Sequence, residues 1–184
     1  MPKLIGERIV LRDYRQEDLQ EIRKWVNDPQ SIQYLSTIFW PPQSIVDTQE
    51  FLDRMMAGSH NGCCFIIAHK EGEDYIGQLD IFRLDWRLRC GELGMIIGAE
   101  TDRGQGYGQE ALSLILRYAF LTLGLERMEL TVDMGNVHAM HCYKKAGFML
   151  EGVKRHASYR EGTFCDVGMM SVLRDEWLAY HCHG

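Results

Sequence analysis

Apolar residues occur along the chain in two patterns. In the first they form short runs, and in the second they recur at every third or fourth position. The first pattern predicts strands, and the second predicts helices. The predicted strands are residues 8–12, 65–69, 75–82, 92–97, 127–132 and 166–173. The predicted helices are residues 17–26, 44–56, 111–123 and 136–146.

The strongest helical pattern lies in the middle of the chain. Its apolar positions fall on one face of a helix. The stripe consists of Ala111, Leu112, Ile115, Leu116, Ala119, Phe120 and Leu123. Gly124 is well placed to end the helix, and a polar, glycine-rich loop at residues 100–108 precedes it. The apolar run at 92–97 before that loop predicts a buried central strand.

The order of these elements limits the fold. Turn-forming residues 70–74 join two strands into a hairpin, and Glu161-Gly162 predicts the turn of a second hairpin near the end. One parallel crossover is evident, between residues 92 and 132, where a helix separates two strands. The pattern predicts a mixed α/β (α+β) fold, with residues 1–184 forming a single domain.

Composition narrows the class of protein. Apolar residues make up 46% and charged residues 25%, which is typical of a globular protein in water. The N-terminal residues lack the apolar core of a signal peptide and no apolar run is long enough to cross a membrane, so we expect a cytoplasmic protein without a membrane partner. The net charge of −6 argues against a nucleic-acid partner. It suits a cationic small molecule or a basic peptide, or serves solubility alone.

The cysteines predict neither a disulfide framework nor a metal site. Cys63 and Cys64 are adjacent, and the other cysteines are scattered without a C-x-x-C pair. The C-terminal His181-Cys182-His183 resembles a metal-binding tract, but a fraying terminus makes a poor site. We therefore expect no metal.

The glycine-rich loop is the strongest candidate for ligand binding. Arg103-Gly104-Gln105-Gly106-Tyr107-Gly108 lies between a predicted buried strand and a helix N-terminus, where converging amides and the helix dipole favour a phosphate. A Walker A loop would require Gly-Lys-Ser or Gly-Lys-Thr, which is absent here. A dinucleotide-binding loop would follow its strand at once and would need further strand–helix units after residue 132.

Two motifs resemble those of the GNAT superfamily of acetyltransferases. The first is Arg/Gln-x-x-Gly-x-Gly/Ala, met by Arg103, Gly106 and Gly108. The second is Asn136-x-x-Ala139-x-x-x-Tyr143-x-x-x-Gly147-Phe148. The resemblance spans essentially the whole chain and is closest to the branch with ribosomal-protein N-terminal and spermidine acetyltransferases. It implies a central mixed, mostly antiparallel sheet flanked by helices on both faces, acetyl-CoA as cosubstrate and, as is frequent in the family, a homodimer.

The resemblance also assigns the cofactor site. The loop and helix N-terminus would cradle the pyrophosphate of coenzyme A, and the preceding strand would hold the pantetheine arm through its backbone. The implied cofactor-binding residues are Met95, Ile96, Ile97, Arg103, Gly104, Gln105, Gly106, Tyr107, Gly108, Asn136 and Tyr143.

Acetyl transfer to an amine requires a neutral nitrogen and a proton for the departing thiolate. Glu92, at the start of the central strand, is the predicted base, acting directly or through water; a solvated strand-end carboxylate is the alternative. Tyr143 lies about two helical turns after Asn136 and is the predicted acid; simple packing against the sheet is the alternative. Asn136 is expected either to orient the cofactor or only to cap its helix.

We expect direct attack in a ternary complex, because Cys142 points about 100° away from Tyr143 on the helix. The acceptor is predicted to be a protein or peptide N-terminal amine, with a polyamine or other small amine as the alternative. A non-catalytic acyl-CoA-binding sensor is the alternative of another class. Acids in the acceptor pocket would favour a dication. The expected pocket residues are Trp25, Tyr34, Phe39, Trp40 and the hairpin at 156–164, unless the aromatics form a satellite core.

Overall fold

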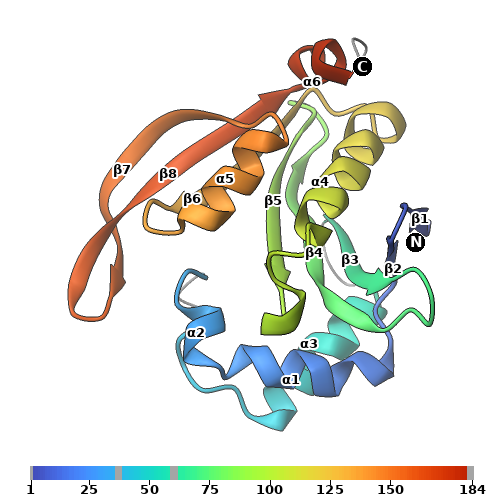
Figure 1. Ribbon diagram of the computed structural model, residues 1–184, viewed down its shortest axis with the longest axis vertical. Coiled ribbons are helices and arrows are strands. Elements are labelled where there is room, and N and C mark those ends of the chain that lie inside the picture. Colours follow the sequence, from blue (N-terminus) through green and yellow to red (C-terminus); the bar gives the residue numbers. More distant parts are fainter. Residues whose placement is uncertain (1, 36–38, 59–61, 182–184) are drawn as a thin grey trace.

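Figure 1 shows the computed structural model of the chain, an eight-stranded sheet with helices packed against it. The structure describes residues 2–35, 39–58 and 62–181. The strands are β1 (Leu4–Ile5), β2 (Ile9–Arg12), β3 (Gly62–His69), β4 (Tyr75–Asp85), β5 (Cys90–Ile97), β6 (Arg127–Asp133), β7 (Met149–Arg160) and β8 (Thr163–Leu173). The helices are α1 (Leu19–Val26), α2 (Pro29–Ile32), α3 (Ile45–Met56), α4 (Tyr107–Arg117), α5 (Val137–Lys145) and α6 (Arg174–His181).

The sheet has the strand order β1-β2-β3-β4-β5-β6-β8-β7. Every neighbouring pair is antiparallel except β5 and β6, which run parallel. This parallel pair is the crossover that the sequence predicts between residues 92 and 132. The predicted fold class, a mixed and mostly antiparallel sheet with helices on both faces, is confirmed.

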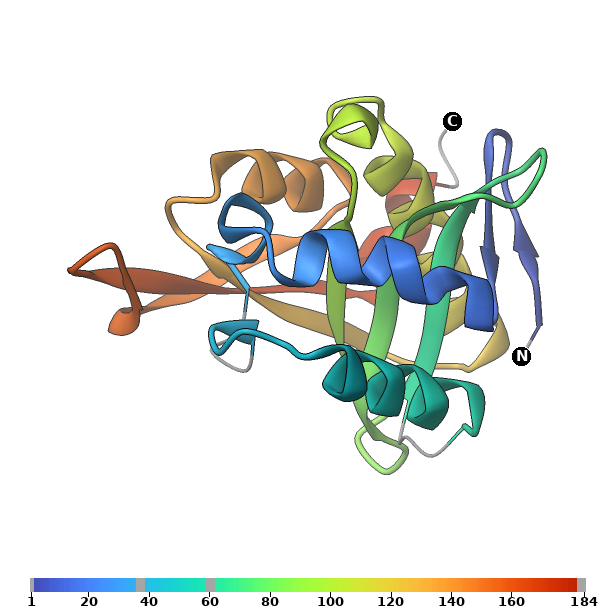
Figure 2. The same cartoon turned by 90° about the horizontal axis from the view of Figure 1, so that it is seen from below.

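Two apolar cores lie on opposite faces of the sheet. The larger core packs α4 and α5 against the sheet and includes Leu93 and Tyr143. The smaller core packs α1 and α3 against the other face and includes Trp25 and Leu52. Figure 2 shows α1 and α3 lying together across the strands. Because side chains alternate along a strand, neighbouring residues of β5 enter different cores.

Helix α4 confirms the predicted apolar stripe. The six stripe residues from Ala111 to Phe120 are fully buried, and Leu123 packs against the same core. The helix begins at Tyr107, within the predicted loop, and after Arg117 it widens into a π-helical turn at Tyr118–Thr122. Gly124 follows with a left-handed φ of 68°, which explains why a glycine ends this segment.

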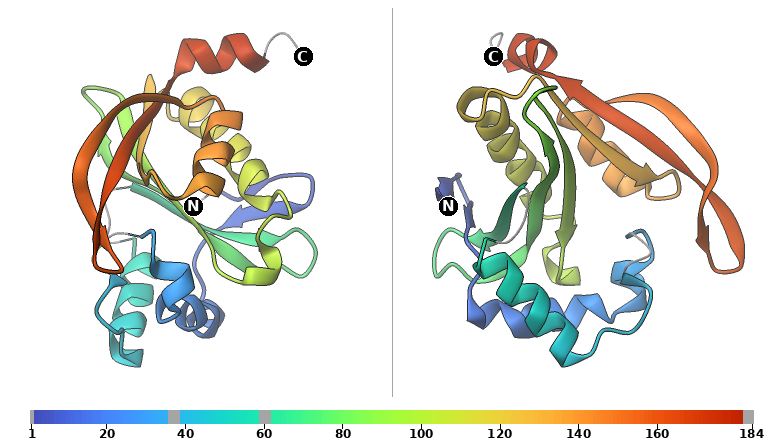
Figure 3. Two further views of the ribbon diagram at one scale, coloured as in Figure 1. Left: turned by 60° about the vertical axis from the view of Figure 1, so that its left-hand side comes forward. Right: turned by 180° about the vertical axis from the view of Figure 1, so that it is seen from behind.

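The second predicted hairpin is also present. Glu161 and Gly162 both have positive φ, 49° and 81°, as the two central residues of a tight hairpin turn require. The strands of the hairpin are longer than predicted, and Figure 3 shows them extending away from the helices. The register of β7 shifts between Leu150 and Gly152 and again between Lys154 and Ser158.

Among the described strands and α-helices, β1, α2 and α6 were not predicted. The first two are too short to show a periodic pattern. Helix α6 packs against a distant segment of the chain: the ring of Trp177 lies against that of Phe120, with centroids 5.6 Å apart. Cys182 and His183 of the C-terminal His-Cys-His tract, where we expect no metal, lie outside the described residues. In the part that the structure describes, no helix has the length and apolar character to cross a membrane, and no three metal-binding side chains come together.

Candidate active site

The parallel strands β5 and β6 separate soon after they begin. Their pairing covers Cys90 with Arg127, Gly91 with Met128 and Glu92 with Glu129. Beyond these positions β5 continues to Ile97 and β6 to Asp133, with no further pairing between the two strands. The backbone groups on this edge of β5 are therefore available to a ligand, whereas the other edge is paired with β4.

The glycine-rich loop joins the end of β5 to the N-terminus of α4. Gly104 and Gly106 have left-handed φ of 74° and 85°, a conformation that costs other residues energy. Gly106 is the N-cap of α4 and supplies no side chain to cap its first turn. The first amides of α4 therefore lack a side-chain acceptor, as a phosphate-binding helix terminus requires.

Two arginines hold this loop in place. Arg103 donates to the carbonyls of Ile97 (3.3 Å) and Gly98 (3.2 Å) and to Ser31 Oγ (2.7 Å), so its guanidinium joins the loop to β5 and α2. Arg8, which sequence reasoning missed, donates to the Gln105 carbonyl at 2.9 Å. It also lies over the Tyr107 ring, 5.0 Å from the centroid. A direct contact of Arg103 with phosphate stays a prediction.

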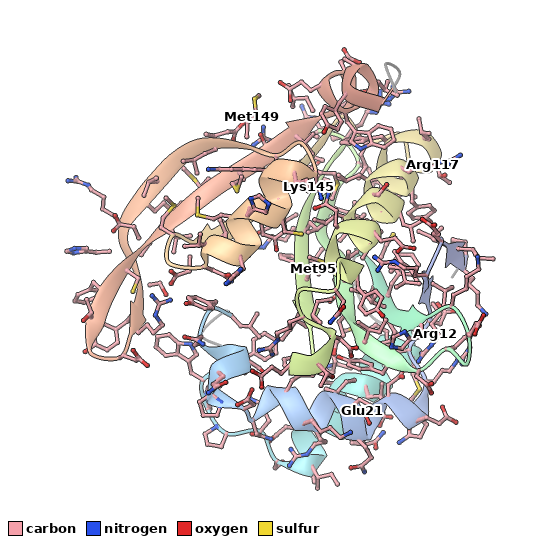
Figure 4. The ribbon with its side chains drawn as sticks, in the orientation of Figure 1. Arg12, Glu21, Met95, Arg117, Lys145 and Met149 are labelled. Atoms are coloured by element: carbon pink, nitrogen blue, oxygen red, sulfur yellow. The ribbon has the colours of Figure 1, made fainter. Side chains whose placement is uncertain are left out.

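Strand β5 and the first turn of α4 pack closely at Gly108. Met95 lies on β5 with its side chain toward α4 (Figure 4), and a Cβ added at Gly108 would come within 3.2 Å of Met95 Cε. A larger residue at 108 would therefore fill the space between β5 and the first turn of α4. The predicted backbone ligands Met95, Ile96 and Ile97 all lie on the part of β5 that β6 leaves unpaired.

Helix α5 places Tyr143 on the α4 side of the sheet. Asn136 is the N-cap, and its Oδ1 accepts a hydrogen bond from the Ala139 amide at 3.1 Å. It therefore caps the helix, and its contact with the cofactor stays a prediction. Tyr143 is 7% exposed, and its ring packs against Phe148 at 5.8 Å. Burial raises the pKa of the Tyr143 phenol, which keeps the proton on its oxygen at neutral pH.

Cys142 lies beside Tyr143 but has the properties of a protonated thiol. Its Sγ is 3.6 Å from Gln109 Oε1, and burial raises the pKa of the thiol. A thiolate rather than a thiol is the nucleophile in covalent catalysis. These features agree with the prediction that the acetyl group does not pass through Cys142.

Glu92 lies on the opposite face of the sheet from Tyr143. Leu93 enters the core under α4 and α5, so its neighbour Glu92 points to the side of α1 and α3. Its carboxylate forms an ion pair with Arg83 at 2.8 Å. The two predicted catalytic residues therefore approach the separation of β5 and β6 from different sides.

The predicted aromatic pocket is divided between a core and a contact with the hairpin. Trp25 is buried, and its ring lies 5.7 Å from Phe39, which is the satellite core given above as the alternative. Trp40 is 40% exposed. Tyr34 instead lies under Arg160 of the hairpin, 4.5 Å from its guanidinium carbon, and Arg160 pairs with buried Asp133 at 3.2 Å. The end of β6, the hairpin and the segment after α2 are thereby joined.

Sequence reasoning missed a line of polar side chains on the same face as Glu92. Trp25 Nε1 donates to Tyr75 Oη at 2.8 Å, and Tyr75 Oη donates to Gln78 Oε1 at 3.2 Å. Gln78 Nε2 donates to Tyr14 Oη at 3.1 Å, and Tyr14 Oη donates to Asp80 Oδ1 at 3.3 Å. The alternation of polar Gln78 and Asp80 with apolar residues in β4 is the one local signal of this line.

Comparison with known proteins gives a consistent result. The family model described as "Acetyltransferase (GNAT) domain" matches residues 8–149. Spermidine N(1)-acetyltransferase of Escherichia coli K12 is 26% identical over 176 residues, covering 94% of this chain and 90% of that protein. An uncharacterized N-acetyltransferase p20 of Bacillus licheniformis is 27% identical over 179 residues, covering 96% and 99%.

A solved structure shares the fold. The spermidine N-acetyltransferase of Vibrio cholerae, in complex with CoA and spermine, superposes with a TM-score of 0.81 and 24% identity, covering 93% of this chain and 98% of that one. The family model spans most of the chain, including the glycine-rich loop and α5. The chain therefore belongs to the GNAT acetyltransferase family and is an acetyl-CoA-dependent N-acetyltransferase.

Proposed function

We propose that the acceptor is a small polycationic amine of the polyamine type. The observation that carries this proposal is the pair of carboxylates, Glu92 and Asp80, on the side of the sheet opposite Tyr143. Carboxylates attract an ammonium group and a second positive charge beyond it. The spermidine acetyltransferases among the relatives support the same choice. The prediction of a peptide N-terminal amine has less support.

The cofactor side supplies binding and a proton. The amides of the loop at 104–108 and the N-terminus of α4 would hold the pyrophosphate, and the unpaired edge of β5 at Met95–Ile97 would hold the pantetheine arm. Tyr143 would donate its proton to the leaving thiolate, since the burial that raises its pKa keeps it protonated until the charge develops. No covalent enzyme intermediate is needed.

The acceptor side supplies charge. Glu92 would attract the ammonium group of the acceptor, in competition with Arg83, which is exposed and free to move away from the carboxylate. Its predicted role as the base, directly or through water, stays open to test. The homodimer also stays a prediction, and light scattering of the purified protein would test it.

Thiol release from acetyl-CoA tests the acceptor. The panel holds spermidine, spermine, an aminoglycoside, and peptides with Ser, Ala or Met at the N-terminus. We expect kcat/KM for spermidine or spermine to exceed that for every peptide by at least about tenfold, the effect of one charge-assisted contact. A preference for peptides would instead support a peptide N-terminal amine as the acceptor. No turnover with any amine, together with calorimetric binding of acetyl-CoA, would favour the sensor.

A further inference from the structure

Asp80 receives the last hydrogen bond of the polar line on the face of the sheet under α1 and α3, which we call the acceptor face. The Trp25 indole can only donate a hydrogen bond, so the Tyr75 hydroxyl accepts from it. Tyr75 in turn donates its hydroxyl hydrogen to Gln78. Gln78 then accepts through Oε1 and donates through Nε2, which leaves Tyr14 to donate to Asp80. Each bond fixes the direction of the next. The line therefore orients one carboxylate oxygen and favours the ionised form of Asp80.

The place of Asp80 in the sheet brings it within one strand of the opening between β5 and β6. In the register of β4 and β5, Asp80 is opposite Gly94, and Phe82 is opposite Glu92, the last residue of β5 that pairs with β6. Asp80 and Glu92 are thus diagonal neighbours on one face; Glu92 borders the opening between β5 and β6, and Asp80 lies one strand further away. Gly94 has no side chain, and the Phe82 ring lies over it, with Cε1 3.0 Å from the place of a Gly94 Cβ; Asp80 itself is half-buried.

The charge environments of the two carboxylates differ. Glu92 has an ion-pair partner, the exposed Arg83. Among the described residues, no basic side chain forms an ion pair with Asp80; the titratable groups that face it are Tyr14, Tyr75 and Cys64, with Glu92 and its Arg83 at the adjacent position. Asp80 is therefore a negative charge that lacks its own cation on the side from which a cationic amine would arrive.

Burial also adjusts the basicity of Asp80. It raises the pKa of this carboxyl to about 7, and hydrogen bonds from Cys64, Tyr14 and the Phe65 amide reduce the rise. A base with a pKa near the working pH is the most effective in proton transfer. Ordinary aspartates, with a pKa near 4, are far weaker bases.

We propose that Asp80, rather than Glu92, takes the proton from the incoming ammonium group, and that Tyr14 positions it. This inference rests on the proposed acetylation of an amine that arrives protonated, but not on its being a polyamine. Asp80 carboxylate accepts one N–H proton and becomes the acid, leaving a neutral amine. Its nitrogen lone pair forms the C–N bond while the C–S bond breaks. Tyr143 protonates the thiolate and regains a proton from the new amide nitrogen, and Asp80 returns its proton to water.

The dependence of kcat/KM on pH tests the proposal. For the wild type we expect kcat/KM to fall below about pH 7 as Asp80 becomes protonated. The acceptor amine titrates near pH 10 and gives a separate limb of the pH profile of kcat/KM. D80N should lower kcat/KM at pH 7 by about 100-fold and remove the lower limb, as expected for loss of a base. Y14F should move this limb to higher pH, because loss of the Tyr14 hydrogen bond raises the pKa of Asp80.

Controls separate proton transfer from folding and from acceptor choice. The Kd for acetyl-CoA and the Tm show whether D80N is folded, and D85N, at the far end of β4, should keep wild-type kinetics. Hydroxylamine is largely unprotonated at neutral pH, so D80N should slow its acetylation by less than about tenfold. A lower limb that disappears in E92Q instead of D80N would overturn the inference, as would an equal loss of both acceptors in D80N.

The same experiment distinguishes this inference from the polyamine proposal. If spermidine is not acetylated but another protonated amine is, the polyamine proposal is wrong and the D80N measurements are made with that amine. If spermidine is acetylated by D80N with the wild-type pH profile, the role of Asp80 is wrong and the acceptor class stands.

Discussion

On the face of the sheet covered by α4 and α5, the groups that we propose for the cofactor are backbone amides, three glycines and one buried phenol. The face under α1 and α3 instead presents two carboxylates and a line of polar side chains that begins at Trp25 and ends at Asp80. The first site comes mainly from one loop and one helix. The second joins residues from the segment after β2, from α1 and from two strands. A cosubstrate shared by a family suits a local motif, whereas an acceptor that varies suits scattered side chains that change separately.

The largest expected effect comes from placing charge in the cofactor loop. G106E puts a carboxylate where we expect phosphate and forces a non-glycine residue into a left-handed conformation, which by itself costs about 1–2 kcal/mol. We expect the Kd for acetyl-CoA to rise by more than about 100-fold in calorimetry. G104A has the same conformational cost without the charge, and no atom lies within 4 Å of its new Cβ. Equal affinities for G106E and wild type would mean that the phosphates bind elsewhere.

Removal of the phenol tests the chemistry of the same face. Y143F keeps the ring that packs on Phe148 and loses the proton donor. We expect kcat to fall by about 100-fold while the Kd for acetyl-CoA stays within about twofold. Y118F is the matched control, because Tyr118 also packs by its ring edge, against Phe65. Unchanged turnover in Y143F would remove the acid assignment.

On the acceptor face, Glu92 provides a smaller effect of a different kind. E92Q removes one charge that attracts the ammonium group, and we expect KM for spermidine to rise about tenfold with kcat nearly unchanged. E126Q is the control, since Glu126 also pairs with an arginine, Arg89 at 3.0 Å, but precedes β6, away from the part where β5 and β6 separate. A large fall in kcat for E92Q would instead assign the base to Glu92.

The smallest effect is expected at Cys142. C142A removes a thiol whose pKa is raised by burial, and turnover should stay within about twofold of wild type. Intact-mass spectrometry after mixing with acetyl-CoA should show no acetylated protein. An acetyl group on Cys142 together with a loss of turnover in C142A would establish a covalent route and contradict direct attack.

The sequence alone determined the elements with strong periodicity and the cofactor loop. The stripe of α4 lies in the core, Glu161-Gly162 turns the second hairpin, and the glycines at 104 and 106 adopt the left-handed conformations that glycine permits. These features depend on residues that are neighbours in the chain, so a single stretch of sequence contains the information. The same reasoning explains why the family motifs identified acetyl-CoA.

Only the tertiary structure decided what lies on the acceptor face. Asp80 is one polar residue in a strand until the fold places Tyr14 beside it, Gly94 opposite it and Glu92 at the adjacent position. The sequence suggests Glu92 and Tyr143 as one catalytic pair. Because side chains alternate along β5, however, Glu92 points away from the face on which α5 places Tyr143. Burial, pairing and the separation of β5 from β6 depend on contacts between distant segments, and therefore no local pattern predicts them.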